Sequence, residues 1–120
     1  MHELSIAQNI LEIVQQSVPE AEASAVRYVR VRVGQLSGVV PESLDFCFSA
    51  LVSDTNWQRA TLDFEQTPAT FRCKECSHHY QDEDMTFICP ICKSKNIELT
   101  SGKELELVEI ELIDKHDEAL

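Results

Sequence analysis

The sequence has no long hydrophobic run. Apolar residues make up 43% of its 120 residues, yet no continuous stretch approaches the roughly 20 residues that a membrane-spanning helix requires. Glu3, Glu12 and Gln15 interrupt the N-terminal apolar residues, which argues against a secretory signal peptide. We therefore expect a cytoplasmic protein with no membrane association. The length favours one domain, or one domain with a small insert.

Basic residues are scarce. The chain carries 10 lysines and arginines against 21 aspartates and glutamates, for a formal net charge of −11. Such a surface repels a phosphate backbone unless a local basic patch overrides it. The cysteine-rich segment 69–101 carries no such patch, because its acidic residues match or exceed its basic ones. We therefore expect no nucleic-acid partner. The charge suits metal cations and basic protein surfaces instead.

The remaining sequence contains no low-complexity tract, and its apolar patterns predict two helices and three strands. Helical spacing predicts a helix over 4–18, and Pro41 suits the first position of a second helix over 41–53. Period-two alternation predicts three strands, over 27–33, 61–66 and 103–114. The last strand changes phase near Leu107–Val108, which indicates an extra residue, a β-bulge. Cys47 shares the apolar face of the second helix and is interpreted as a small buried residue.

The charges on the strands predict their order. Arg30 and Arg32 occupy the polar face of strand 27–33, whereas the polar faces of the other two strands are acidic. Opposite charges across a sheet contribute roughly 0.2–1 kcal/mol per pair. The arginine strand is therefore predicted in the middle, with strands 27–33 and 61–66 as parallel neighbours joined by a right-handed crossover. A simply solvated arginine face is the alternative.

Together these patterns predict an α+β fold class, with two helices on a three-stranded mixed sheet and an inserted zinc ribbon.

The cysteine-rich segment reads CKECSHHYQDEDMTFICPICKSKN. Two C-x2-C turns that face each other present four thiolates in the tetrahedral arrangement that suits Zn(II). Its candidate ligands are Cys73, Cys76, Cys89 and Cys92. Four protein ligands fill the shell, so the metal is predicted to be structural. A segment of about 30 residues cannot fold on its own apolar burial.

Alternatives to this zinc site remain open. Iron in the same four-cysteine site would make a rubredoxin-like electron carrier, and paired redox dithiols are a further reading. The gap between the two turns has room for a hairpin such as 80–87. His78 and His79 follow the first turn; they either support or replace a cysteine ligand or are ordinary exposed residues.

The N-terminal residues MHEL offer a second set of metal ligands. The amine of Met1, the imidazole of His2 and the neighbouring amides, including that of Glu3, form a nitrogen-rich, nearly planar set that suits Ni(II) or Cu(II). Glu3 has an ordinary interpretation as well, because an acidic residue in the first turn interacts favourably with the helix dipole. The residues alone leave both interpretations open.

In their order, these features resemble the HypA/HybF family: an N-terminal MHE, a helix, a strand–helix–strand unit, two CxxC turns and a final strand. The segment VGQLSGVVPESLDFCF also resembles the family. The resemblance implies a nickel metallochaperone, not an enzyme, that serves maturation of [NiFe]-hydrogenase or, in some organisms, urease. It assigns nickel to Met1, His2 and Glu3, zinc to the four cysteines, and a place beside the first CxxC to His78. Lys93 and Ser94 follow the second CxxC here, where some members carry a histidine.

The resemblance also implies domains and partners. We expect a nickel-binding domain over 1–68 and 102–120 and a zinc-binding domain over 69–101. The expected partners are a HypB-type maturation GTPase and the hydrogenase large-subunit precursor. The sequence leaves open whether the chain also forms a homo-oligomer. The alternative function is a zinc-stabilised adaptor without nickel, whose acidic surface docks a basic protein.

Overall fold

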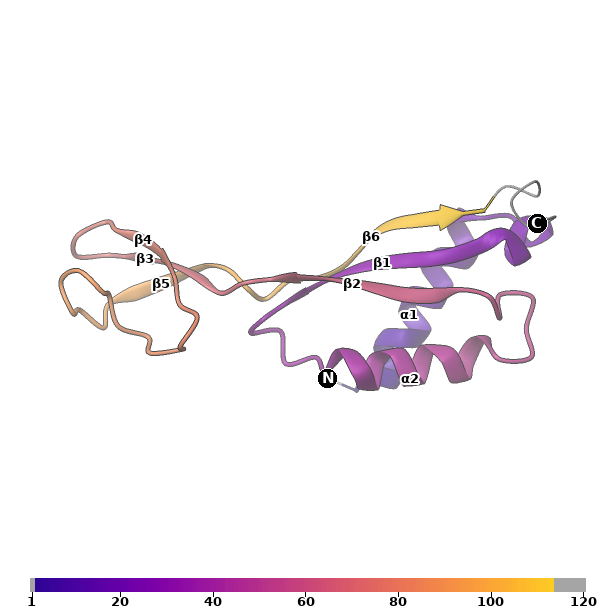
Figure 1. Ribbon diagram of the computed structural model, residues 1–120, viewed down its shortest axis with the longest axis horizontal. Helices are drawn as coiled ribbons and strands as arrows, with labels where there is room; N and C mark the ends of the chain where they lie inside the picture. The colour runs from indigo at the N-terminus through magenta and orange to yellow at the C-terminus, as the bar shows by residue number, and fades with distance from the viewer. Residues whose placement is uncertain (1, 114–120) are drawn as a thin grey trace. The chain divides into compact units, whose positions relative to one another are not determined.

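All five predicted helices and strands form, with ends within two residues of the predicted ones. The computed structural model describes residues 2–113 (Figure 1). Along the chain the elements are α1 (Glu3–Ser17), the 3₁₀ helix η1 (Glu20–Ala25), β1 (Val26–Gly34), α2 (Pro41–Val52), β2 (Thr61–Thr67), β3 (Thr70–Cys73), β4 (His79–Gln81), β5 (Ile97–Ser101) and β6 (Leu105–Leu112). Within residues 2–113, no helix is long and apolar enough to span a membrane.

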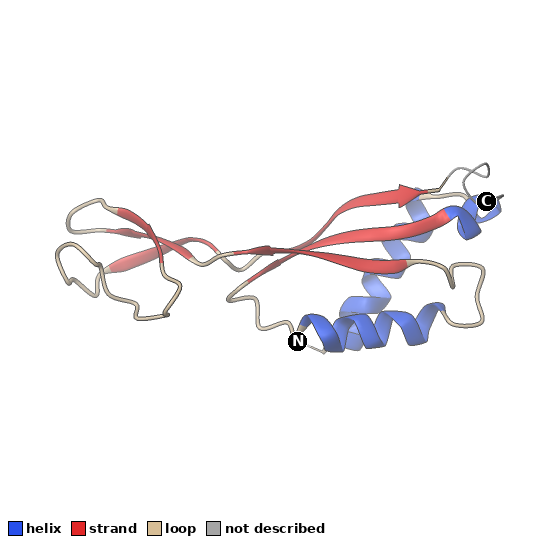
Figure 2. Cartoon of the chain, viewed as in Figure 1, coloured by secondary structure: helices blue, strands red, loops and turns tan. Residues whose placement is uncertain are grey.

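The chain divides into two compact units (Figure 2). The sheet unit comprises the described residues of Met1–Arg32, Val39–Glu65 and Glu106–Leu120. The ribbon unit comprises Val33–Gly38 and Gln66–Leu105.

The first sheet has the strand order β2-β1-β6, so the arginine strand lies in the middle, as predicted. The Arg30 and Arg32 guanidinium groups bind Asp63 and Glu65, respectively, on β2. Because both residue numbers rise together, β1 and β2 run parallel, as predicted. The sheet is mixed, since the contacts of β1 with β6 run in the opposite sense.

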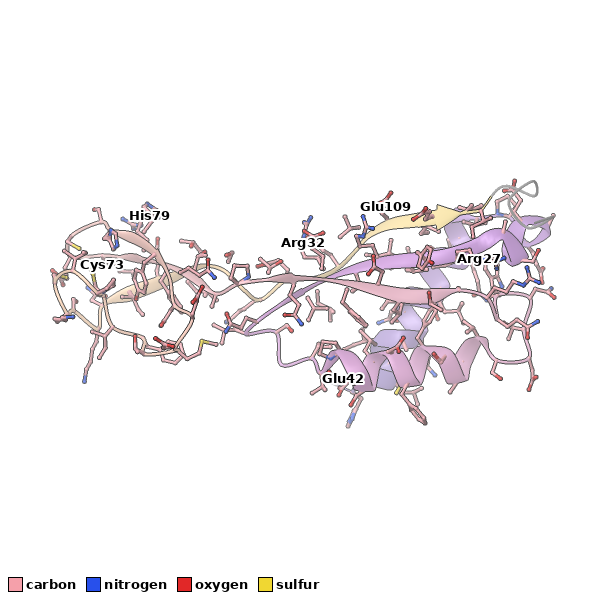
Figure 3. All side chains as sticks on the ribbon, in the orientation of Figure 1. Arg27, Arg32, Glu42, Cys73, His79 and Glu109 are labelled. Atoms are coloured by element: carbon pink, nitrogen blue, oxygen red, sulfur yellow. The ribbon has the colours of Figure 1, made fainter. Side chains whose placement is uncertain are left out.

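Each central arginine bridges both neighbouring strands. Arg30 donates to Asp63 at 3.2 Å and to Glu109 at 2.8 Å. Arg32 donates to Glu65 at 3.4 Å and to Glu106 at 3.0 Å. Positions 106 and 109 on β6 thus face two arginines that are only two residues apart on β1. This spacing is what an extra residue near Leu107–Val108 would produce, and the bulge there stays a prediction. Figure 3 labels Arg32 and Glu109 on this sheet.

The core of the sheet unit lies between the helices and the valine side of β1. Helices α1 and α2 contact each other, and their apolar stripes are buried with the alternate valines of β1. The largest fully buried side chains of this unit are Val14, Val26, Val29, Val31, Leu44 and Phe48. The prediction that Cys47 is buried was wrong, because it is only half-buried. The i, i+4 stripe of Leu44, Phe48 and Val52 occupies the core-facing side of α2, and Cys47 lies at its flank.

The ribbon unit contains a second sheet, with the order β4-β3-β5 and antiparallel pairs. The suggested hairpin over 80–87 does not form. Instead, β3 and β4 make the hairpin and turn through the first CxxC. Residues beyond β4 leave the sheet because the Asp82 carboxylate accepts hydrogen bonds from the amides of Thr86 and Phe87. Those amides are therefore not available for a strand ladder.

Candidate metal centre

The four cysteines of the two CxxC turns come together at one end of the ribbon unit. Their sulfur atoms all lie within 4.8 Å of one another. The Sγ atoms of Cys73 and Cys92 are 3.5 Å apart, and those of Cys76 and Cys89 are 3.6 Å apart. Cys73 and Cys89 are buried, whereas Cys76 and Cys92 are exposed. The first cysteine of each turn therefore anchors the site from the inside.

The two turns have the same backbone construction. In the first, Ser77 N–H donates to the Cys73 carbonyl at 2.9 Å, and Cys73 N–H donates to the His78 carbonyl at 2.9 Å. The second repeats both bonds at the same spacing, from Lys93 to Cys89 at 3.0 Å and from Cys89 to Ser94 at 2.9 Å. Ser77 and Lys93 both take positive φ angles, 65° and 63°. Each turn thus directs its two thiols to the same side.

The backbone amides of the turns favour a thiolate at the first cysteine of each. The Cys76 amide, with that of Glu75, lowers the pKa of Cys73. The Cys92 amide, with that of Ile91, lowers the pKa of Cys89 to about 6. The pKa values of the two outer thiols, Cys76 and Cys92, are raised instead. The His78 amide opposes the rise, but partial loss of hydration at the sulfur and the Cys89 thiol raise the pKa of Cys76.

The Ser94 amide similarly opposes a rise in the pKa of Cys92, but the Cys73 thiol and burial outweigh it and raise that pKa to about 12. A metal ion binds the four cysteines as thiolates, so its binding must displace the protons that these thiols hold.

The sulfur geometry fits a tetrahedral metal. Zn–S bonds of about 2.3 Å place the sulfurs of a regular four-thiolate site about 3.8 Å apart. The two distances of 3.5 and 3.6 Å and the outer limit of 4.8 Å bracket that value. All four donors come from the protein, so no position is left for a substrate, which is the pattern of a structural zinc.

The two ribbon histidines do not belong to this cluster in the described part of the chain. The His78 ring stacks on Tyr80, with ring centres 6.0 Å apart and planes 6° from parallel. His79 lies on β4 opposite Arg72 and is exposed (Figure 3). Any role for either residue as a replacement ligand would require the turn to rearrange.

The N-terminal candidates are placed in part. His2 is exposed at the N-cap position of α1, and its side chain makes no capping hydrogen bond. Glu3 is half-buried in the first turn. Met1, whose amine belongs to the predicted nickel ligands, lies outside the described residues. The imidazole of His2 thus has no capping role that would compete with metal binding.

Sequence reasoning missed Asp82, which it treated only as one of several surface acids. Its carboxylate is 5% exposed and shapes the loop that leads to the second CxxC. An aspartate followed four residues later by threonine is a pattern typical of side-chain-to-backbone turns and was the available signal.

An exposed histidine at the first helix, joined to a four-thiolate ribbon, defines a metal-binding protein of the α+β class. The family model described as "Hydrogenase/urease nickel incorporation, metallochaperone, hypA" matches residues 1–112, and the chain belongs to this family. The family consists of nickel metallochaperones for metalloenzyme maturation, not of enzymes.

Curated relatives agree with this assignment, and a solved structure shares the fold. The chain is 41% identical to hydrogenase maturation factor HypA of Desulfosudis oleivorans over 113 residues, covering 93% of this chain and 98% of the relative. It is 39% identical to the factor of Desulfatibacillum aliphaticivorans over 118 residues, covering 98% and 91%. The solution structure of the Ni metallochaperone HypA from Helicobacter pylori shares the fold, with a TM-score of 0.63 at 24% identity, covering 94% of this chain and 98% of that one.

Proposed function

We propose that this protein binds Ni(II) as its cargo at the N-terminus and delivers it for maturation of [NiFe]-hydrogenase. The observation that carries the proposal is the family match, which begins at residue 1 and includes the MHE residues. The exposed His2 side chain, which makes no capping hydrogen bond, supports it.

The proposed nickel ligands are the Met1 amine, the His2 imidazole and amide, and Glu3. An amine with a reference pKa of about 7.7–8.0 must lose its proton to bind a metal, as must the amides. Binding therefore weakens as pH falls, and proton competition supplies a route for release to an acceptor. Such a nitrogen-rich set discriminates against zinc, which prefers tetrahedral thiolates.

We assign Zn(II) to Cys73, Cys76, Cys89 and Cys92, where it stabilises the ribbon. The corresponding domains are 69–101 for zinc and 1–68 with 102–120 for nickel. His78 and His79 are proposed as groups that support or replace a zinc ligand when the turn rearranges.

By family membership, the proposed partners are a HypB-type maturation GTPase and the hydrogenase large-subunit precursor. We place the protein in the cytoplasm, whose reducing conditions keep the four thiols available for metal.

The test is metal analysis of protein with its native N-terminus, compared with two variants: His2→Ala, and a chain with one residue added before Met1. Both variants are expected to lose nickel in equilibrium dialysis while zinc stays bound. The matched control is His116→Ala, which removes a histidine that belongs to neither proposed metal site and is expected to keep nickel and zinc binding. Unchanged nickel stoichiometry in both variants contradicts the proposal.

Two outcomes point to the alternatives. Zinc without titratable nickel in the unaltered protein supports a zinc-stabilised adaptor that docks a basic protein. One iron with a visible chromophore supports an electron carrier.

A further inference from the structure

A cavity of about 500 Å³ lies in the ribbon unit, beside the second CxxC turn. Its lining includes the side chain of Tyr80, three acidic residues of the loop after β4, and apolar side chains next to Cys89. The residues that line it include Tyr80, Glu83, Asp84, Ile88 and Pro90. Neither the four-sulfur site nor the N-terminal nickel ligands account for this cavity.

The hydroxyl of Tyr80 has no hydrogen-bond partner among the described residues, although it is buried. The ring itself is held in place, because it stacks between Phe71 at 5.8 Å and His78 at 6.0 Å. The side chain of Tyr80 therefore gives the cavity a fixed wall.

The charge of the cavity favours a cation. Glu83 and Asp84 are exposed and contribute carboxylates to its lining, against one lysine, Lys93. The neighbouring Asp82 carboxylate is already occupied by the amides of its own loop.

Apolar surface adjoins these charges. Ile88 and Pro90 line the cavity, and their sequence neighbours Phe87 and Ile91 are 45% and 66% exposed. A long basic side chain has the same two parts, an apolar stem and a charged head. The whole chain is strongly acidic, with net charge −11, which disfavours a second copy of the same chain as the occupant.

We propose that this cavity is a docking site for an arginine or lysine of a partner protein, carried on an extended segment with apolar neighbours. The cationic head pairs with Glu83 and Asp84. The stem and the flanking apolar residues cover Ile88, Pro90 and the exposed side chains beside them. The proposal is independent of nickel binding.

The first test is calorimetric titration of the zinc-loaded full chain with the peptide acetyl-Gly-Leu-Arg-Leu-Gly-amide. The same peptide with neutral citrulline in place of arginine is the comparison, and it is expected to bind more weakly. The double variant Glu83→Gln, Asp84→Asn is expected to weaken binding of the arginine peptide about tenfold. The matched control, Glu12→Gln with Glu22→Gln, removes the same charge from the sheet unit and should change binding by less than about twofold.

The second test is Ile88→Ala in the folded, zinc-loaded protein, which removes apolar lining of the cavity and is expected to weaken peptide binding about threefold. Each of four results overturns the proposal: no binding of the arginine peptide at millimolar concentration, equal binding of the two peptides, equal weakening by the control pair, or unchanged peptide affinity in Ile88→Ala. Self-association that only the Glu83, Asp84 variant abolishes assigns the cavity to a second copy instead.

Discussion

Asp82 is the buried charged side chain of residues 2–113, and its carboxylate organises the loop before the second CxxC. It accepts from the Phe87 amide at 2.8 Å, the Thr86 amide at 3.0 Å and the Thr86 hydroxyl at 3.3 Å. Asp82→Ala leaves these donors unpaired and is expected to destabilise the ribbon by about 1–3 kcal/mol. Denaturant unfolding of the zinc-loaded protein measures the loss. The exposed neighbour provides the control, since Asp84→Ala should change stability by less than about 0.5 kcal/mol.

The same carboxylate predicts a pH dependence. Burial alone would raise the pKa of Asp82, but the amides of Phe87 and Thr86 outweigh it and hold the pKa below its usual value. A depressed folded-state pKa contributes stability that is complete above the unfolded value of about 3.9 and is lost as pH falls through the folded value. The amide signal of Phe87 should therefore titrate in NMR spectra only below about pH 4. Asp82→Asn should abolish that titration, and a midpoint above pH 4 would contradict the prediction.

Gly34 shows that a missing side chain can matter as much as a charged one. Its N–H donates to the Glu104 carbonyl at 2.7 Å, and a Cβ added there would lie 2.2 Å from the Gly102 carbonyl oxygen. Gly34→Ala must push two backbone segments of the ribbon unit apart, which should cost about 3 kcal/mol.

Gly38→Ala is the control for this substitution. It has a φ of 79° but no atom within 4 Å of an added Cβ, so it should cost only about 1 kcal/mol. Equal losses in the two variants would show that backbone strain, not the close approach at Gly34, sets the cost.

At the scale of elements, charge patterning was as informative as apolar periodicity. The arginines of β1 and the acidic residues of β2 and β6 predicted the strand order. The spacing of the cysteines likewise indicated that four sulfurs would gather. Loop 82–88 was missed because its shape depends on which amides the Asp82 carboxylate accepts from, and the spacing of Asp82 and Thr86 was its one signal. The Tyr80 cavity could not be predicted, since it depends on how the loop after β4 packs against the second CxxC turn.

The arginine ladder predicts an unusual response to salt. Arg30→Gln leaves Asp63 and Glu109 on either side of β1 without the cation between them, so the remaining carboxylates repel each other. The thermal midpoint should fall at low ionic strength, and added NaCl should recover part of that loss by screening the repulsion. Thermal unfolding at two salt concentrations tests this. Lys95→Gln removes the same charge from the ribbon unit, and an equal salt response in that variant would refute the ladder's role.

At the scale of the whole molecule, the two units differ in what stabilises each of them. The sheet unit has an extensive apolar core. In the ribbon unit, the buried apolar side chains among the described residues are Val33, Ala69, Phe71, Cys73 and Cys89. Two of these five are candidate metal ligands. A unit with so little buried apolar surface depends on its metal for stability.

Metal removal should therefore unfold one unit and spare the other. In Cys89→Ser, or after chelation, backbone amide signals from 70–101 should collapse to random-coil positions while those of α1, α2 and β1 keep their dispersion. Cys47→Ser is the control, because Cys47 is a half-buried thiol on α2 outside the sulfur cluster, and its loss should leave both units folded with metal bound. Collapse of the sheet unit together with the ribbon would show that the two fold as one cooperative body. A ribbon that kept its dispersed signals without metal would show that Asp82 and the Phe71 ring cluster suffice to hold it.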